Sequence, residues 1–106
     1  MANTYINAKV DLTTTDVTTL YTAATYTTGI VKSILVSEDT GNADTITATI
    51  TNGSTVYSLF KTKAVGANAT VELLTAPLVL QPAEILKVTA ATANRLHVVA
   101  SILEIT

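Results

Sequence analysis

The sequence of 106 residues contains no cysteine and no tryptophan, and it has one histidine and two prolines. Without cysteine the chain can have neither a disulfide nor a thiolate metal site, so it needs no oxidising compartment. The single histidine, His97, alternates with Leu96 and Val98 and has no second base or ligand beside it. We therefore expect His97 to be a polar side chain on a strand, and we expect no metal and no cofactor.

Charged residues are also scarce, at 13% of the chain, and the formal net charge is −2. The six cations are spread along the sequence, which argues against a groove that follows phosphates, so nucleic acid is not an expected partner. No apolar run is long enough to span a bilayer, and the first residues lack the basic and apolar regions of a signal peptide. We expect a chain that is made and kept in water, without a membrane partner.

Threonine is abundant instead, with 22 copies beside 15 alanines. In residues 44–51, DTITATIT, alternation places the apolar side chains on one face of a strand and the threonines on the other. A threonine hydroxyl carries no charge, so another subunit can cover such a face at a modest desolvation cost. Thr45, Thr47 and Thr49 are therefore predicted to belong to a contact surface between subunits.

Period-2 alternation and turn residues predict an all-β chain of about eight short strands. Antiparallel strands without intervening helices are typical of a single antiparallel β-sandwich, with either jelly-roll or immunoglobulin-like topology. At this length we expect one domain, residues 1–106. The expected strands are Thr4–Asp11, Val17–Tyr21, Ile30–Ser37, Asp44–Thr51, Thr55–Lys63, Thr70–Leu74, Ile85–Ala90 and Leu96–Ile105. The expected core residues are Ile34, Val36, Ile46, Ile50, Leu59, Val71, Leu73, Val88, Val98 and Ile102. The outer faces are then expected to be rich in hydroxyl groups.

Asn52-Gly53 is the strongest turn signal in the sequence. It joins two runs of matching length, and this dipeptide favours positive φ at both central positions of a two-residue loop. The sequence therefore predicts a type I′ hairpin at this point.

Residues 1–28 contain ten threonines and three tyrosines, and 11–28 is the stretch with the weakest periodicity. Such a segment is expected to bury little apolar surface by itself, but its composition suits strand addition at a sheet edge. We predict that Thr4–Asp11 or Val17–Tyr21 lies at an edge and contributes to subunit contact, with an ordinary first strand as the alternative. Because aromatic rings give a large contact area at low entropic cost, its tyrosines are the expected anchors. They are Tyr5, Tyr21 and Tyr26.

The tripeptide Asp39-Thr40-Gly41 resembles the active-site signature of retroviral-type aspartic proteases. These enzymes are all-β dimers in which two such aspartates share a proton. Glu38 stands where that family has an apolar residue, and no glycine follows Gly66. Both departures weigh against a protease, and no catalytic residue is expected.

The same loop offers Glu38, Asp39, Asn42 and Asp44 as oxygen ligands for calcium. Their spacing is not that of an EF-hand, and a solvated turn explains these residues without a metal.

A sandwich that binds host sugars is a further alternative, but the absence of tryptophan and of clustered aromatics weighs against it.

Residues 31–105 resemble small virion proteins of tailed bacteriophages, notably those of marine and cyanobacterial phages. The resemblance rests on the run VKSILVSEDTGNADTITATI, on the L-x-P-x-E-x-L-x-V element from Leu80 to Val88, and on a last strand that ends in Leu-Glu-Ile. It leaves the first 30 residues unmatched, and the family has no catalytic residues to transfer.

The resemblance implies a β-sandwich on the exterior of a virion, made in the host cytoplasm. The implied function is a non-enzymatic capsid decoration (cement) protein that stabilises the assembled head, and a neck, tail or fibre component is the alternative. The implied partners are further copies of the chain and phage major capsid or tail proteins. A threonine face of low charge suits such repeated contacts.

Overall fold

The computed structural model describes residues 2–106, and in that range the chain forms nine strands and no helix. The strands are β1 (Asn3–Leu12), β2 (Thr18–Thr22), β3 (Thr28–Glu38), β4 (Asp44–Asn52), β5 (Thr55–Val65), β6 (Thr70–Glu72), β7 (Leu78–Leu80), β8 (Ile85–Ala90) and β9 (Leu96–Ile105). The all-β prediction is confirmed. No helix in the described range is long and apolar enough to cross a membrane.

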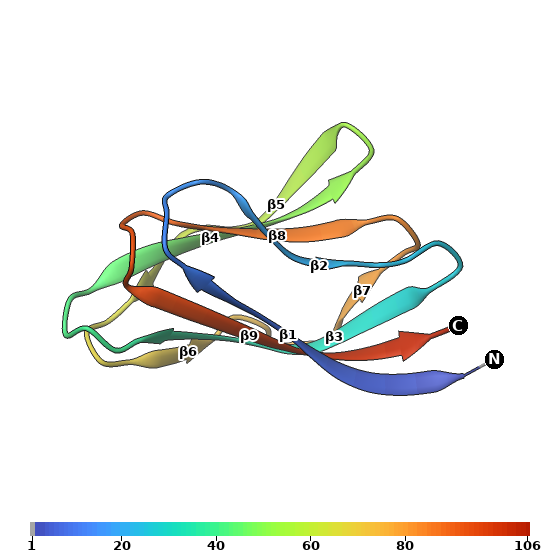
Figure 1. Cartoon of the computed structure of the whole chain (residues 1–106), viewed down its shortest axis with the longest axis horizontal. Coiled ribbons are helices and arrows are strands. Elements are labelled where there is room, and N and C mark those ends of the chain that lie inside the picture. Colours follow the sequence, from blue (N-terminus) through green and yellow to red (C-terminus); the bar gives the residue numbers. More distant parts are fainter. Residues whose placement is uncertain (1) are drawn as a thin grey trace.

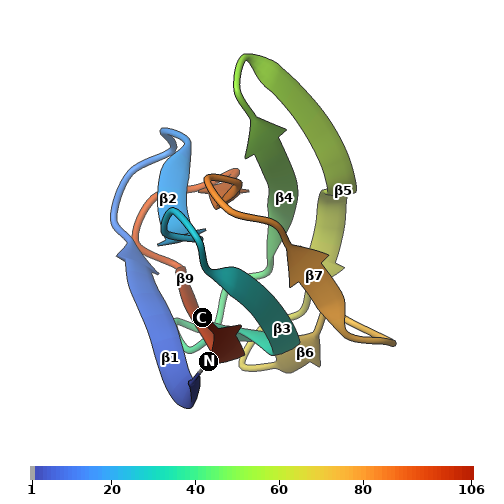
Figure 2. The same cartoon turned by 90° about the vertical axis from the view of Figure 1, so that its right-hand side faces the viewer.

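Two antiparallel sheets pack face to face as a sandwich (Figures 1 and 2). The five-stranded sheet has the order β1-β9-β3-β6, with β7 also paired to β3, and the four-stranded sheet has the order β2-β8-β4-β5. Strands β1 and β2 therefore each form an edge, in different sheets. In an immunoglobulin constant-type sandwich the first two strands are neighbours in one sheet, so the strand order here is not immunoglobulin-like.

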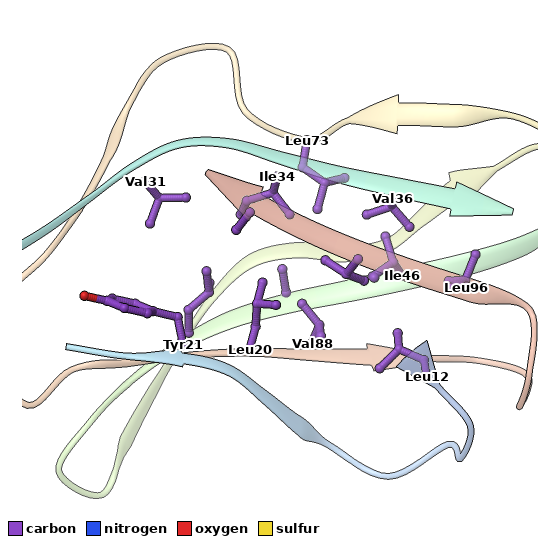
Figure 3. Close-up of a cluster of buried hydrophobic side chains, with 14 of the residues drawn as sticks. Leu12, Leu20, Tyr21, Val31, Ile34, Val36, Ile46, Leu73, Val88 and Leu96 are labelled. Carbon is purple, nitrogen blue, oxygen red and sulfur yellow. The ribbon is translucent and has the colours of Figure 1, made fainter. Parts of the chain in front are cut away.

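The core lies between the sheets and is built from alternate residues of the central strands. In β9, Leu96, Val98 and Ala100 have no exposed surface, because their side chains all point inward. Figure 3 shows Val31 and Ile34 of β3 facing the side chains of the other sheet. Most of the expected core residues are buried, while Ile50, Leu59 and Val71 are partly buried and pack against the core.

The N-terminal third belongs to both sheets. β1 pairs with β9 along its full length, and β2 pairs with β8. Leu12, Leu20 and Ala23 lie in the core. The segment thus buries apolar surface together with the rest of the chain, because an edge strand still presents one face to the opposite sheet.

Strand β7 was not predicted. It has three residues between Pro77 and Gln81, which is too short a run to display an alternating pattern. It pairs with the first half of β3, while β6 pairs with the second half. The two short strands together complete one edge of the five-stranded sheet.

The turn between β4 and β5 differs from the predicted one. Asn52 pairs with Thr55, so the central residues are Gly53 and Ser54, and of these only Gly53 has a positive φ, of 61°. Positive φ at the first central residue alone is typical of a type II′ turn. The Asn52 amide is held by the Glu84 carboxylate at 3.1 Å, which keeps Asn52 in the strand.

Candidate functional site

The outer face of the five-stranded sheet carries more apolar surface than the alternation of its strands predicts. Alternation turns the odd-numbered residues of β9 away from the core, and the register places Val99 opposite Leu35 of β3. Val99 is 38% exposed and Leu35 is 40% exposed. The expected hydroxyl-rich outer face is therefore wrong for this sheet.

A second apolar row crosses the same face nearer the chain termini. Tyr5 of β1 lies opposite Leu103, Leu103 opposite Ile30, and Ile30 opposite Val79 of β7. Tyr5 and Val79 at the two ends are 74% and 53% exposed, and the two central residues are half-buried. Exposed apolar side chains on one continuous face are typical of an interaction surface.

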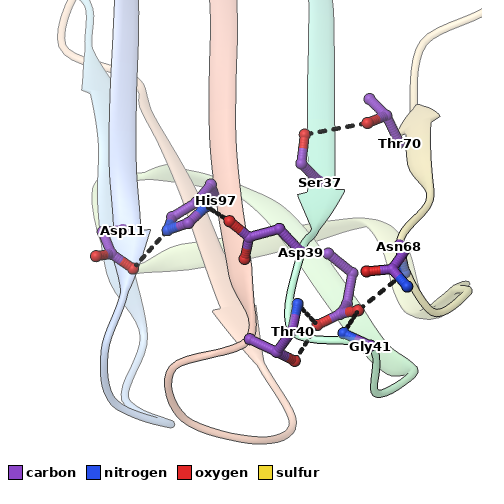
Figure 4. Close-up of polar contacts among 9 residues, drawn as sticks. Asp11, Ser37, Asp39, Thr40, Gly41, Asn68, Thr70 and His97 are labelled. Carbon is purple, nitrogen blue, oxygen red and sulfur yellow. Dashed lines mark hydrogen bonds and ion pairs between the residues drawn. The ribbon is translucent and has the colours of Figure 1, made fainter.

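Polar groups gather at the opposite end of this face. Nε2 of His97 lies 3.3 Å from Oδ1 of Asp11, and Nδ1 lies 3.8 Å from Oδ2 of Asp39 (Figure 4). The Ser37 hydroxyl is directly across the strand from His97, but it is hydrogen-bonded to the Thr70 hydroxyl at 3.2 Å. Since both ring nitrogens of His97 face carboxylates, the histidine does not activate the serine. Ser37 and His97 therefore do not form a nucleophile-base pair.

The loop after β3 is organised by the carboxylate of Glu38, which is 2% exposed. Oε1 accepts hydrogen bonds from the backbone N–H groups of Gly41 (3.0 Å), Asn42 (3.1 Å) and Asn68 (3.0 Å). Oε2 accepts from the backbone N–H of Thr40 (2.8 Å) and from its hydroxyl; Figure 4 includes the contacts with Thr40, Gly41 and Asn68. Burial acts to raise the pKa of Glu38, but these donors outweigh it and lower the pKa from 4.5 to about 2. Glu38 thus joins the β3–β4 and β5–β6 turns.

Two of the four candidate calcium ligands, Glu38 and Asp44, are engaged by the chain itself. Both oxygens of Glu38 accept backbone hydrogen bonds, and the carboxylate of Asp44 accepts from the backbone N–H groups of Thr45 (2.8 Å) and Thr92 (3.1 Å). Within residues 2–106, no group of three or more His, Asp or Glu side chains is placed to hold a metal ion. The loop geometry gives the calcium hypothesis no support.

The aspartic protease hypothesis is also left without support. The Asp39 side chain is 66% exposed and faces His97, whereas a shared-proton pair of carboxylates needs a confined site that keeps both oxygens close together. The Thr40 hydroxyl of the same tripeptide donates to Glu38. The residues of the motif therefore build a turn.

The three predicted threonines, Thr45, Thr47 and Thr49, lie half-buried on the outer face of the four-stranded sheet. Across the strands they meet further small or hydroxyl-bearing residues, such as Thr89 opposite Thr47 and Ser58 opposite Thr49. Thr47 also has a structural role, because its hydroxyl accepts a hydrogen bond from the backbone N–H of Thr62 (3.1 Å), whose φ is 50°. That bond supports a β-bulge in the edge strand β5. Their contact role stays a prediction.

The three predicted tyrosine anchors have different environments. Tyr5 and Tyr26 are 74% and 89% exposed, which suits a contact role. Tyr21 is buried, and its hydroxyl donates to Oε2 of Glu104 at 2.6 Å. Its ring packs on Gly29, where an added Cβ would lie 2.8 Å from Cε2. Burial, with the hydrogen bond and charge of Glu104, raises the pKa of Tyr21. The ring of Tyr21 fills the core of its own chain, and the predicted contact role of the three tyrosines stays a prediction.

Replacing Tyr21 with phenylalanine should lower the free energy of unfolding by about 1–2 kcal/mol, because a half-buried hydrogen bond to a carboxylate is lost. Chemical denaturation measures the change. Tyr26→Phe is the matched control, since the same hydroxyl is removed from an exposed ring, and its effect should stay within about 0.5 kcal/mol. Equal effects in the two variants would contradict the internal role of Tyr21.

The apolar outer face could have been recognised in the sequence. In residues 96–105, LHVVASILEI, most of the even-numbered and most of the odd-numbered positions are apolar. A strand that is apolar on both faces is typically covered on both faces. The core predicted from this strand includes only two even-numbered positions, Val98 and Ile102. Val79 had no comparable signal, because β7 is so short.

No protein-family model matches the chain, and no curated protein matches it. Among solved structures, the chain is similar to two crystal structures of a pentameric capsid protein isolated from metagenomic phage sequences, with a TM-score of 0.44 for each. The identities are 20% and 21% over 93% of this chain, which spans 66% and 58% of the length of those two proteins.

Proposed function

We propose that this chain is a non-enzymatic structural protein of a bacteriophage virion, and specifically a capsid decoration protein on the exterior of the head. The observation that carries the proposal is that each outer face presents uncharged side chains between a few charged ones. One face exposes Tyr5, Leu35, Val79 and Val99, and the other presents rows of threonine. Faces of this kind are suited to being covered by neighbouring subunits, because little charge must be desolvated.

The strand order supports the same proposal. The order β1-β9-β3-β6 in one sheet and β2-β8-β4-β5 in the other is the arrangement of a double-sheet jelly roll, with β6 and β7 sharing one edge position. Jelly rolls recur in viral capsid domains and also in lectins and cupins. This support is an analogy at the level of the fold, and the resemblance of residues 31–105 to phage virion proteins selects the capsid alternative.

A decoration protein works by binding alone. Each copy contributes a small binding free energy to the assembled shell and none to dispersed subunits, so the shell is stabilised by mass action over many symmetric contacts. The proposed partners are the major capsid protein and other copies of the chain, which would be made in the host cytoplasm. No chemical step is required of any residue.

Phage particles produced without this chain should assemble but rupture at a lower temperature or at lower salt than complete particles. Adding the purified protein back should restore their resistance, which a heat-release assay for packaged DNA measures. An electron-microscopy map of the complete particle provides the control for location. Density for the chain on the neck, tail or fibre, together with unchanged rupture of depleted heads, would replace the decoration role with a tail role.

A further inference from the structure

We infer that the outer face of the five-stranded sheet binds the same face of a second copy of this chain. The two copies would be related by a two-fold axis that lies between their five-stranded sheets and runs parallel to the strands. The inference deepens the proposed structural role, on which its biological meaning rests. The partner of this exposed surface is then a second copy of the chain.

The register of the sheet places opposite charges at the two ends of one row. Lys9 of β1 lies opposite Val99, Val99 opposite Leu35, and Leu35 opposite Glu72 of β6. Lys9 and Glu72 are exposed. Lys9 donates a hydrogen bond to Oδ1 of Asn7 (3.0 Å), and the Glu72 carboxylate accepts from the backbone N–H groups of Ile34 in β3 (2.7 Å) and Leu74 (3.2 Å). The row therefore has a cation at one edge of the sheet, an anion at the other, and apolar residues in between.

A two-fold axis parallel to the strands reverses the order of the residues within each cross-strand row. Each row then lies opposite the same row of the second copy. Lys9 of one copy then faces Glu72 of the other, at both ends of the row, while Val99 faces Leu35 in the middle. The row nearer the termini also matches, because Tyr5 meets Val79 and Leu103 meets Ile30. In the central row, the exposed Lys32 at the bulge of β3 would face Ser101 of the other copy. The two apolar rows are thus complementary to themselves, as an isologous interface requires.

The other in-plane axis, perpendicular to the strands, gives a poor match. Rotation about the row that contains Ser101 would exchange the row of Lys9 with the row of Tyr5. Lys9 would then face Tyr5, and Glu72 would face Val79, so both charges would lose water against uncharged side chains. The positions of Lys9 and Glu72 therefore favour the axis that is parallel to the strands.

The size of the face fits a stable dimer. β1 and β9 have ten residues each, which corresponds to a length of about 33 Å at the usual rise per residue. Four strand positions at the usual spacing give a width of about 19 Å, so the flat area is on the order of 600 Å² before the relief of side chains is counted. A standard interface buries roughly 800 Å² per partner, and aligned packing of two sheets is a common arrangement.

Sedimentation equilibrium of the purified chain over micromolar to millimolar concentrations tests the dimer directly. We expect a reversible monomer–dimer equilibrium, and Val99→Lys should abolish it. Val56→Lys is the matched control, because Val56 is 60% exposed on the outer face of the four-stranded sheet and should leave the equilibrium unchanged. A chain that stays monomeric throughout, or a dimer that is lost equally in both variants, would overturn the inference.

The charge pattern is tested by two further variants. Lys9→Glu and Glu72→Lys should each weaken self-association about tenfold, because each places like charges together at both ends of the row. An equimolar mixture of the two variants should recover a dimer close to wild-type affinity, since the heterodimer restores both opposite-charge contacts. If the mixture associates no better than its components, the proposed axis is wrong.

These tests separate the dimer from the virion role. Lys9→Glu and Val99→Lys leave Glu72 and its backbone contacts untouched, so they remain informative even if Glu72→Lys does not fold. Solution measurements on the purified chain require no phage particle. A monomeric chain that still restores heat resistance to depleted heads would overturn the dimer alone, and a dimer that does not bind heads would overturn the decoration role alone.

Discussion

Glu38→Gln is expected to be the most destabilising removal of a single charge in this chain at neutral pH. The Glu38 carboxylate accepts five hydrogen bonds, three on Oε1 and two on Oε2, all from donors in two turns. A glutamine keeps one acceptor oxygen and replaces the other with an NH₂ group. At least two donors would then face another donor, and a buried donor without a partner is costly.

The effect should depend on pH in a defined direction. The pKa of Glu38 is about 2 in the folded chain, below its ordinary value of 4.5, so the folded state favours the ionised form. The stability that this ionisation contributes is fully present above about pH 5 and is lost as the pH falls towards about 2. Denaturation of wild type and variant between pH 2 and pH 7 should therefore give curves that lie furthest apart near neutrality and converge in acid.

Asp39→Asn is the matched control for this experiment. It makes the same change of charge at the next residue, where the carboxylate is exposed and has only a long contact with His97, at 3.8 Å. Its effect should stay within about 0.5 kcal/mol, as is usual for an exposed ion pair. If the two variants were equally stable, or if Glu38→Gln kept the acid-dependent slope of the wild type, Glu38 would not be the group that holds the loop.

The strands could be predicted because they are regular. Alternation in residues 44–51 and 85–90 marks one buried face, and the structure places β4 and β8 there. The pairing of the strands could not be predicted in the same way. The rows that cross the five-stranded sheet join residues as distant as Tyr5 and Leu103, and a single sequence has no periodic signal for such contacts.

The role of Glu38 was missed for a related reason. The sequence places Thr40 and Gly41 close to Glu38, and an acidic residue before such a turn is a signal for local backbone hydrogen bonds. The donor from Asn68 comes from 30 residues further along the chain and depends on the two turns lying side by side. The hydrogen bonds of Glu38 within its own turn could therefore be predicted from the sequence. The hydrogen bond from Asn68, which ties the two turns together, could not.

The short strand β7 provides the second large expected effect. Leu80 has no exposed surface and lies opposite Gly29 in the pairing of β7 with β3. Its side chain belongs to the core cluster between the two sheets. Leu80→Ala should lower the free energy of unfolding by about 2–5 kcal/mol, the range found when a large side chain is truncated in a packed core.

Val79→Ala is the matched control, because it truncates the adjacent residue of the same strand, whose side chain is 53% exposed on the outer face. Its effect should stay within about 0.5 kcal/mol when unfolding is followed at concentrations where the chain is monomeric. A difference of several fold between the two neighbours would establish that β7 belongs to the core despite its length of three residues. Similar losses in both variants would mean that β7 contributes an edge to the sheet and no packing, and the core would then end at β3.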